Sequence, residues 1–151
     1  MIKFFNTHIV FQEIPNMVSL AINITNCQHT CDGCHSPYLR MDIGEELSFD
    51  KLNELMLYNN GIDCVIFMGD GNDKNQIIEL AKKVKYNNLL VALYTGDDFI
   101  YKKYYDVFDY IKTGKFIKER GGLNSKGTNQ KLYQKIDGEF RELIFKHKYV
   151  K

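Results

Sequence analysis

The chain has 151 residues, of which 44% are hydrophobic and 13% aromatic, and this predicts a single domain, residues 1–151, with a packed core. Its 20 Lys and Arg residues are nearly balanced by 19 Asp and Glu residues, giving a formal net charge of +1. This balance argues against nucleic acid as a main partner, because phosphate binding needs an excess of basic side chains.

The amino-terminal segment does not have the pattern of a targeting signal. Its apolar residues are interrupted by His8 and Glu13. The longest apolar-rich stretch, 17–24, contains Ser19 and Asn23 and is too short to span a bilayer. We therefore expect a cytoplasmic protein with no membrane partner, in which the cysteines stay reduced.

Four short apolar runs, each followed by turn residues, predict buried strands. They cover 17–24, 64–68, 89–94 and 107–111. The residues that follow them are rich in Gly, Asp, Asn and Thr, which are residues that favour turns.

Amphipathic helices are predicted between these strands. The first is capped by Ser48 and ends at 59–61. Its predicted apolar face consists of Phe49, Leu52, Leu55 and Met56. The second is capped by Asn72 or Asp73. Its predicted apolar residues are Ile77, Ile78, Leu80, Ala81 and Val84. A shorter helix is predicted over 100–105.

This alternation is typical of an α/β fold with a parallel sheet and right-handed crossovers. Sites in such sheets lie at the carboxyl ends of the strands, so the four turns should meet at one edge. The chain is too short for eight strand–helix units, which favours an open, partial (β/α) barrel. Residues 131–135 and 139–145 predict a β-hairpin across Asp137-Gly138 that pairs antiparallel at an edge.

Three of the four cysteines lie in one loop, at Cys27, Cys31 and Cys34. In a reducing compartment this clustering indicates a metal site rather than disulfides. Three thiolates can bind three irons of a [4Fe–4S] cluster, which leaves the fourth iron open to a small molecule. Cys64 begins a strand at the opposite edge, and we expect it to be a buried core residue. Structural zinc, with His29 or His35 as the fourth ligand, is the alternative.

The loop Cys27-Gln28-His29-Thr30-Cys31-Asp32-Gly33-Cys34 resembles the defining motif of radical S-adenosylmethionine (radical SAM) enzymes. It is most similar to the activating proteins of anaerobic (class III) ribonucleotide reductase, which carry His between the first two cysteines and Gly before the third. Further blocks that resemble this family follow in order at 93–96, 109–116, 121–125 and 128–130. Together the blocks extend the resemblance over most of the chain.

The resemblance implies a shortened, open partial (β/α) barrel of the radical SAM type with a C-terminal β-hairpin. It implies that Cys27, Cys31 and Cys34 hold a [4Fe–4S] cluster whose open iron binds S-adenosylmethionine. One electron would cleave S-adenosylmethionine to methionine and a 5′-deoxyadenosyl radical, which would take a hydrogen from a glycine of the reductase and leave a glycyl radical. The implied partners are the glycyl-radical subunit of anaerobic ribonucleotide reductase and a flavodoxin-like electron donor.

The resemblance also places the methionyl end of the cofactor. Gly69, Asp70 and Gly71 stand where the superfamily has a Gly-Gly-Glu-like turn that contacts the methionyl amine. The family has two adjacent glycines before the acid, whereas here single glycines flank Asp70. The sequence therefore leaves open whether Asp70 or Asp73 contacts the amine.

The adenine is placed by the same resemblance. Gly33, Cys34 and His35 match the segment whose backbone contacts the adenine, and the imidazole of His35 can serve as a flat surface. His29 either donates a hydrogen bond to the cluster or is a solvated loop residue. No catalytic residue is predicted beyond the cluster ligands.

Two alternative functions are considered. The chain could activate a different glycyl-radical enzyme, of the formate-lyase type, although those activases tend to be longer. It has no second cysteine cluster of the kind that some of those activases carry. A zinc-stapled binding module without catalysis is the alternative from another class.

Overall fold

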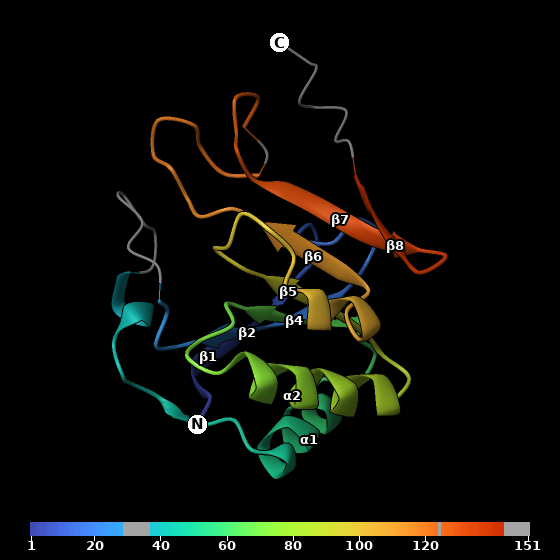
Figure 1. The fold of residues 1–151 in the computed structure, drawn as a ribbon. Helices are drawn as coiled ribbons and strands as arrows, with labels where there is room; N and C mark the ends of the chain where they lie inside the picture. Colours follow the sequence, from blue (N-terminus) through green and yellow to red (C-terminus); the bar gives the residue numbers. More distant parts are fainter. Residues whose placement is uncertain (29–36, 124, 144–151) are drawn as a thin grey trace.

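The computed structural model describes residues 1–28, 37–123 and 125–143 (Figure 1). The described residues form one eight-stranded sheet. Its strands are β1 Lys3–Val10, β2 Ser19–Ile24, β3 Glu45–Glu46, β4 Cys64–Met68, β5 Leu90–Tyr94, β6 Tyr110–Thr113, β7 Lys131–Ile136 and β8 Glu139–Glu142. The helices are α1 Phe49–Tyr58 and α2 Lys74–Tyr86, with short 3-10 helices η1 Pro37–Arg40 and η2 Lys102–Asp106.

The strand order in the sheet is β3-β1-β2-β4-β5-β6-β7-β8. The four central strands, β2, β4, β5 and β6, pair in parallel, and the flanking strands pair antiparallel. The described sheet is therefore mixed, mostly antiparallel by pairing, and not closed into a barrel. The predicted α/β class and the parallel order of the four predicted strands are confirmed.

The amino-terminal flank, β1 and β3, is missing from the sequence-based expectation. Strand β1 has no clean alternation of buried and exposed residues, and its register shifts between Phe4 and Thr7. Strand β3 has only two residues, both exposed. Neither strand gives the apolar pattern by which the other strands are recognised, and both pair antiparallel, which changes the character of the sheet.

Helices α1 and α2 lie together on one face of the sheet (Figure 1). Helix α1 begins as predicted, because the Ser48 side chain accepts a hydrogen bond from the Lys51 amide. Leu52 and Met56 are buried. Phe49, the first residue of the helix and part of its predicted apolar face, is by contrast 52% exposed.

Helix α2 agrees closely with its prediction. Its cap is Asp73, whose side chain accepts a hydrogen bond from the Gln76 amide, and not Asn72. All five predicted apolar residues are buried against the sheet. Within the described residues, no helix has both the length and the apolar character needed to cross a membrane.

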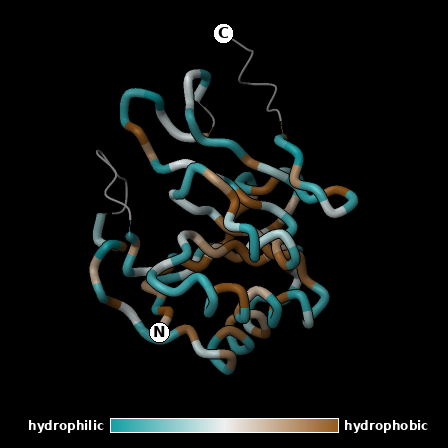
Figure 2. Tube along the Cα trace, viewed as in Figure 1, coloured by the Kyte–Doolittle hydropathy of each residue, from teal (hydrophilic) through white to brown (hydrophobic). Residues whose placement is uncertain are grey.

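Alternate residues of the central strands divide between two apolar clusters. The larger cluster joins the helix face of the sheet to α1 and α2, and includes Phe67 and Leu93. The smaller cluster lies on the other face and joins Cys64 and Ile66 to Ile14, a residue of the β1–β2 connection. Apolar colours are accordingly concentrated along the central strands in Figure 2. The prediction that Cys64 is a buried core residue is confirmed.

Two boundaries near the carboxyl-terminal half differ from the prediction. The strand predicted at 107–111 is found at Tyr110–Thr113, and the short helix at Lys102–Asp106. Val107 and Phe108 are buried before the strand begins, and Phe108 packs edge-on against Tyr104. The apolar run 107–111 therefore indicates correctly that its apolar residues are buried, but it does not give the bounds of the strand.

The predicted hairpin is confirmed in the described residues. Strand β7 pairs antiparallel with β6 and with β8. Asp137 and Gly138 at the turn have φ values of 52° and 81°, which an Asp-Gly turn of the mirror-image type requires. The hairpin thereby extends the sheet on the side away from β1.

Candidate functional site

The turns predicted to form a site lie at one edge of the sheet. Parallel pairing aligns Asn23 with Met68, Met68 with Tyr94, and Tyr94 with Lys112. The segments that follow β2, β4, β5 and β6 therefore leave the sheet side by side. The sequence-based expectation that these four turns share an edge is confirmed.

Cys27 lies at the start of the cysteine loop, three residues after β2, and is half-buried. The Cys27 amide donates to the Leu39 carbonyl at 2.9 Å, and the Asn26 amide donates to the Met41 carbonyl at 3.2 Å. These bonds bring the two ends of the loop together at the edge of the sheet.

Most of the predicted cluster and adenine residues lie outside the described residues. These are His29, Cys31, Gly33, Cys34 and His35. The described residues contain no group of three His, Cys, Asp or Glu side chains that could hold a metal ion. The predicted metal site consequently rests on Cys27 and on the sequence motif.

The turn after β4 depends on its two glycines. Gly69 and Gly71 have φ values of 109° and 58°, in the left-handed region that favours glycine. A Cβ atom on Gly71 would lie 3.0 Å from side-chain atoms of Ile2 and Ile24. The turn is therefore pressed against the end of β2, where the cysteine loop begins.

Between these glycines, the Asp70 carboxylate is buried and accepts hydrogen bonds from side chains of three other segments. Lys74 Nζ donates to Oδ2 at 2.7 Å and the Tyr104 hydroxyl donates to the same oxygen at 2.8 Å. The Thr95 hydroxyl lies 3.3 and 3.4 Å from the two carboxylate oxygens. Burial raises the pKa of Tyr104 strongly, and the neighbouring Asp70 charge adds to this, so the phenol remains a proton donor.

The turn after β5 belongs to the same network. Lys74 Nζ also donates to Asp97 Oδ2 at 2.8 Å. The Asp97 amide donates to the Thr95 hydroxyl, and the Asp97 carbonyl accepts from the Gly114 amide at 2.7 Å. Polar contacts thus connect the turns after β4, β5 and β6, which the sequence could show only as separate segments.

The two acidic residues that the sequence left as alternatives have different structural positions. Asp73 accepts from the Gln76 amide at 3.1 Å and caps helix α2. Asp70 is engaged by Lys74, Thr95 and Tyr104. Both carboxylates therefore make hydrogen bonds within the chain.

Lys112 is a candidate site residue that sequence reasoning missed. It is only 9% exposed, and its Nζ lies 5.2 Å from the centre of the Tyr94 ring, on the face of the sheet without helices. It donates to the Gly114 carbonyl, which also accepts from Gln130. A lysine within a strand of otherwise buried residues was the available signal. Lys74 and Tyr104 gave no such signal, because tertiary contacts alone bring them to Asp70.

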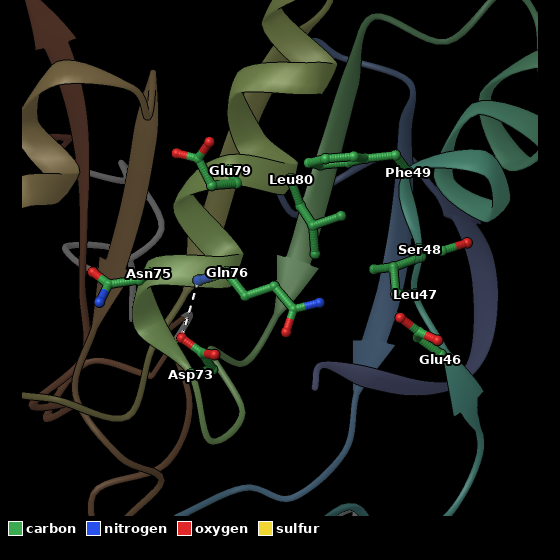
Figure 3. A pocket seen from close by; sticks show the side chains of 9 residues that line it. All are labelled: Glu46, Leu47, Ser48, Phe49, Asp73, Asn75, Gln76, Glu79 and Leu80. Carbon is green, nitrogen blue, oxygen red and sulfur yellow. Dashed lines mark hydrogen bonds between the residues drawn. The ribbon is translucent and has the colours of Figure 1, made fainter.

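A separate groove of about 600 Å³ opens between the first turns of α1 and α2. Figure 3 shows Glu46, Ser48 and Phe49 on one side, with Asp73 and Glu79 on the other. The groove shares the cap residue Asp73 with the turn after β4, and none of its other lining residues was predicted to bind the cofactor. It is therefore distinct from the edge described above.

Comparison of the chain with protein-family models, with curated proteins and with solved structures gives no match. The functional argument accordingly rests on the residues of the chain. These place Cys27, a glycine-flanked acidic turn and a charged network at the carboxyl edge of four parallel strands.

Proposed function

We propose that this protein is a radical SAM activase. In this proposal a [4Fe–4S] cluster held by Cys27, Cys31 and Cys34 serves the reductive cleavage of S-adenosylmethionine, and the product radical generates a glycyl radical on anaerobic ribonucleotide reductase. The observation that carries the proposal is the Cys-x3-Cys-x2-Cys spacing in the loop that leaves β2, whose first cysteine lies at the edge where the turns meet.

The number of cysteines in the loop and the position of Cys27 suit such a cluster. Cys27 is half-buried, at a loop base closed by backbone hydrogen bonds. Cys64 starts β4 at the opposite edge of the sheet, and burial raises the pKa of its thiol to about 12. A buried, protonated thiol is a poor metal ligand, because metals bind the thiolate. Three ligands from the loop, with one iron open, therefore agree better with this chain than four cysteine ligands.

The proposal includes the finer fold class. We interpret β2, β4, β5 and β6, with α1 and α2 on their outer face, as the wall of a shortened, open partial (β/α) barrel of the radical SAM type. The parallel register of the four strands supports this interpretation. The antiparallel strands at both flanks would replace the missing units.

In the proposed site, the backbone of Gly69, Asp70 and Gly71 receives the methionyl end of S-adenosylmethionine, while Gly33, Cys34 and His35 receive the adenine. When bound, the cluster and S-adenosylmethionine supply the one-electron chemistry that yields a hydrogen-abstracting radical. The turn after β4, in which Asp70 is buried, is held by the hydrogen bonds of the Asp70 carboxylate. The proposal requires a reducing compartment, the cytoplasm, and a flavodoxin-like electron donor.

The proposal is tested with the full chain, purified and reconstituted without oxygen. We expect about four irons per chain, since one cube holds four. Reduction in the presence of S-adenosylmethionine should release 5′-deoxyadenosine. Addition of an anaerobic ribonucleotide reductase should then give the doublet of a glycyl radical in electron paramagnetic resonance.

Each outcome distinguishes the alternatives. An iron-loaded protein that never cleaves S-adenosylmethionine contradicts the proposal. A doublet on a formate-lyase type enzyme, without one on the reductase, would reassign the substrate. One zinc per chain, with neither iron nor sulfide after anaerobic purification, would favour the zinc-stapled module.

A further inference from the structure

Lys74 joins two turns of the proposed site through charged hydrogen bonds. Its ammonium lies 2.7 Å from Asp70 Oδ2 and 2.8 Å from Asp97 Oδ2. Asp70 belongs to the turn after β4 and Asp97 to the turn after β5. The lysine is the first residue of helix α2, so the bridge also attaches the helix to both turns.

The position of this lysine is electrostatically unusual. A cation in the first turn of a helix is opposed by the helix dipole, which favours negative charge there. Burial also lowers the pKa of the Lys74 ammonium, but the bonds to Asp70 and Asp97 more than offset this, and the net shift is upward. The two carboxylates therefore keep a charged lysine at a place where the helix alone would disfavour it.

The Lys74 bridge is the charged part of a larger hydrogen-bond network around Asp70. The Asp70 oxygen that accepts from Lys74 also accepts from the buried Tyr104 hydroxyl at 2.8 Å. Lys74 Nζ lies 5.9 Å from the centre of the Tyr104 ring. Asp70 is therefore held from two sides, and its side chain serves the shape of the turn.

We propose that Lys74 is a positioning residue that holds the Gly69–Gly71 turn in the shape that binds the methionyl end of S-adenosylmethionine. This inference rests on the proposed function. It assigns the contact with the ligand to the backbone of the turn and gives the Asp70 side chain a supporting part. A ligand ammonium at Asp70 Oδ2 would have to displace Lys74, whereas a ligand at the backbone would not.

The test compares Lys74→Met with Lys85→Met. Both lysines lie on α2 and pair with aspartate, and their side chains are similarly exposed, at 38% and 40%. Equilibrium binding of S-adenosylmethionine is measured by dialysis on the cluster-loaded full chain without oxygen. We expect Lys74→Met to weaken binding about tenfold, because small displacements in a site have large effects, and Lys85→Met to change it by less than about twofold.

Two further measurements separate positioning from general stability. Lys74→Arg keeps a cation that can reach two carboxylates, and its affinity should stay within about threefold of the wild type. Amide hydrogen exchange of the chain without cluster should become faster in Lys74→Met at 69–73 and 95–98, while the middle of α2 is unchanged. Iron content should be equal in all variants.

The outcomes are distinct. If wild-type protein binds S-adenosylmethionine and Lys74→Met binds it equally well, the positioning role is wrong and the proposed function stands. If Lys74→Met and Lys85→Met weaken binding to the same extent, the effect is general destabilisation and the positioning role is again wrong. If the loaded wild-type protein does not bind S-adenosylmethionine, the proposed function and this role are both overturned.

Discussion

Helix α2 is attached to the sheet by a lysine at each end, and the two attachments differ. At its amino end, Lys74 bridges the carboxylates of Asp70 and Asp97, whose side chains are 7% and 15% exposed. At its carboxyl end, Lys85 makes two 3.0 Å hydrogen bonds to Asp109, which also accepts from the Val91 amide. Lys85 lies where the helix dipole favours a cation, and Lys74 lies where it does not.

The two cysteines among the described residues also differ, because they lie at opposite edges of the sheet. Cys27 follows a strand and is half-buried in a loop. Cys64 begins a strand and is fully buried in the core. At the edge formed by the amino ends of the parallel strands, Cys64 and the Lys85–Asp109 pair therefore lie in positions that favour them. At the edge formed by the carboxyl ends, Lys74 lies where the helix dipole disfavours a cation, and the Asp70 carboxylate is buried. Such conflicts are expected at functional sites.

The largest expected effect separates the cysteines at the two edges. Cys27→Ala should reduce the iron content after anaerobic reconstitution from about four per chain to less than about one, because the cluster loses a ligand. Cys31→Ala and Cys34→Ala should do the same. Cys64→Ala is the matched control and should keep about four irons. Loss of iron from Cys64→Ala would contradict this prediction and would indicate that Cys64 is a cluster ligand.

The next effect compares the aspartates bound to the two ends of α2. Asp70→Asn should lower the free energy of unfolding by about 3 kcal/mol, because the neutral amide removes the negative charge that pairs with the Lys74 ammonium and weakens the bond accepted from the buried Tyr104 hydroxyl. Asp109→Asn should lower it by about 1 kcal/mol, since the Asp109 side chain is 17% exposed, against 7% for Asp70, and water can replace part of what is lost. Urea denaturation of the chain without cluster measures both. Equal losses in the two variants would show that the Asp70 network contributes no more to the free energy of unfolding than the Lys85–Asp109 pair does.

The Cys64 thiol predicts a dependence of stability on pH. Burial raises its pKa from the ordinary 9.0 to about 12. Between these values the unfolded chain releases the thiol proton while the folded chain retains it, so stability is present below pH 9 and falls as the pH rises toward 12. Between about pH 8 and about pH 10, the loss attributable to this thiol should be about 1.4 kcal/mol.

Comparison with Cys64→Ala isolates this thiol. Burial also raises the pKa values of Tyr94, Tyr104 and Tyr110, which contribute to the pH dependence with the same sign in both proteins. Urea denaturation at the two pH values should show the wild type losing about 1.4 kcal/mol more than the variant. Parallel profiles for the two proteins would mean that the thiol is not buried in solution.

The smallest expected effect concerns the ion pair between Lys85 and Asp109 at the carboxyl end of α2. Lys85→Met should lower the free energy of unfolding by about 0.5 kcal/mol, because a partly exposed ion pair contributes little and is screened by salt. Urea denaturation at low and high salt measures it. A loss greater than that of Lys74→Met would contradict the prediction that Lys74 stabilises the fold more than Lys85 does.

Local sequence patterns predicted much of the fold. The apolar face of α2, the two candidates for its cap and the Asp-Gly hairpin were all recognisable from residues close together in the chain. Strand β1 could not be recognised, because an irregular strand near a sheet edge has no regular pattern. Phe49 also misled, because helical spacing indicates which residues share a face but not where the core ends.

The candidate site divides in the same way. The sequence identified the cysteine spacing and the glycine-flanked Asp70, because these are local features. It could not identify Tyr104 as a donor to Asp70, since 34 residues separate them and the contact requires η2 to pack against the sheet. It also gave no means of separating Asp70, which enters this network, from Asp73, which caps a helix.

By itself, then, the sequence determined the strands and helices with strong periodicity, the caps and turns beside them, and the thiol spacing from which a metal site is proposed. Only the tertiary structure decided that the central parallel strands are flanked by antiparallel ones and that Lys74 bridges two turns. The physical reason is the range of the interactions. Propensities and caps act over a few residues, whereas strand order and buried charge networks depend on segments that meet only when the chain has folded.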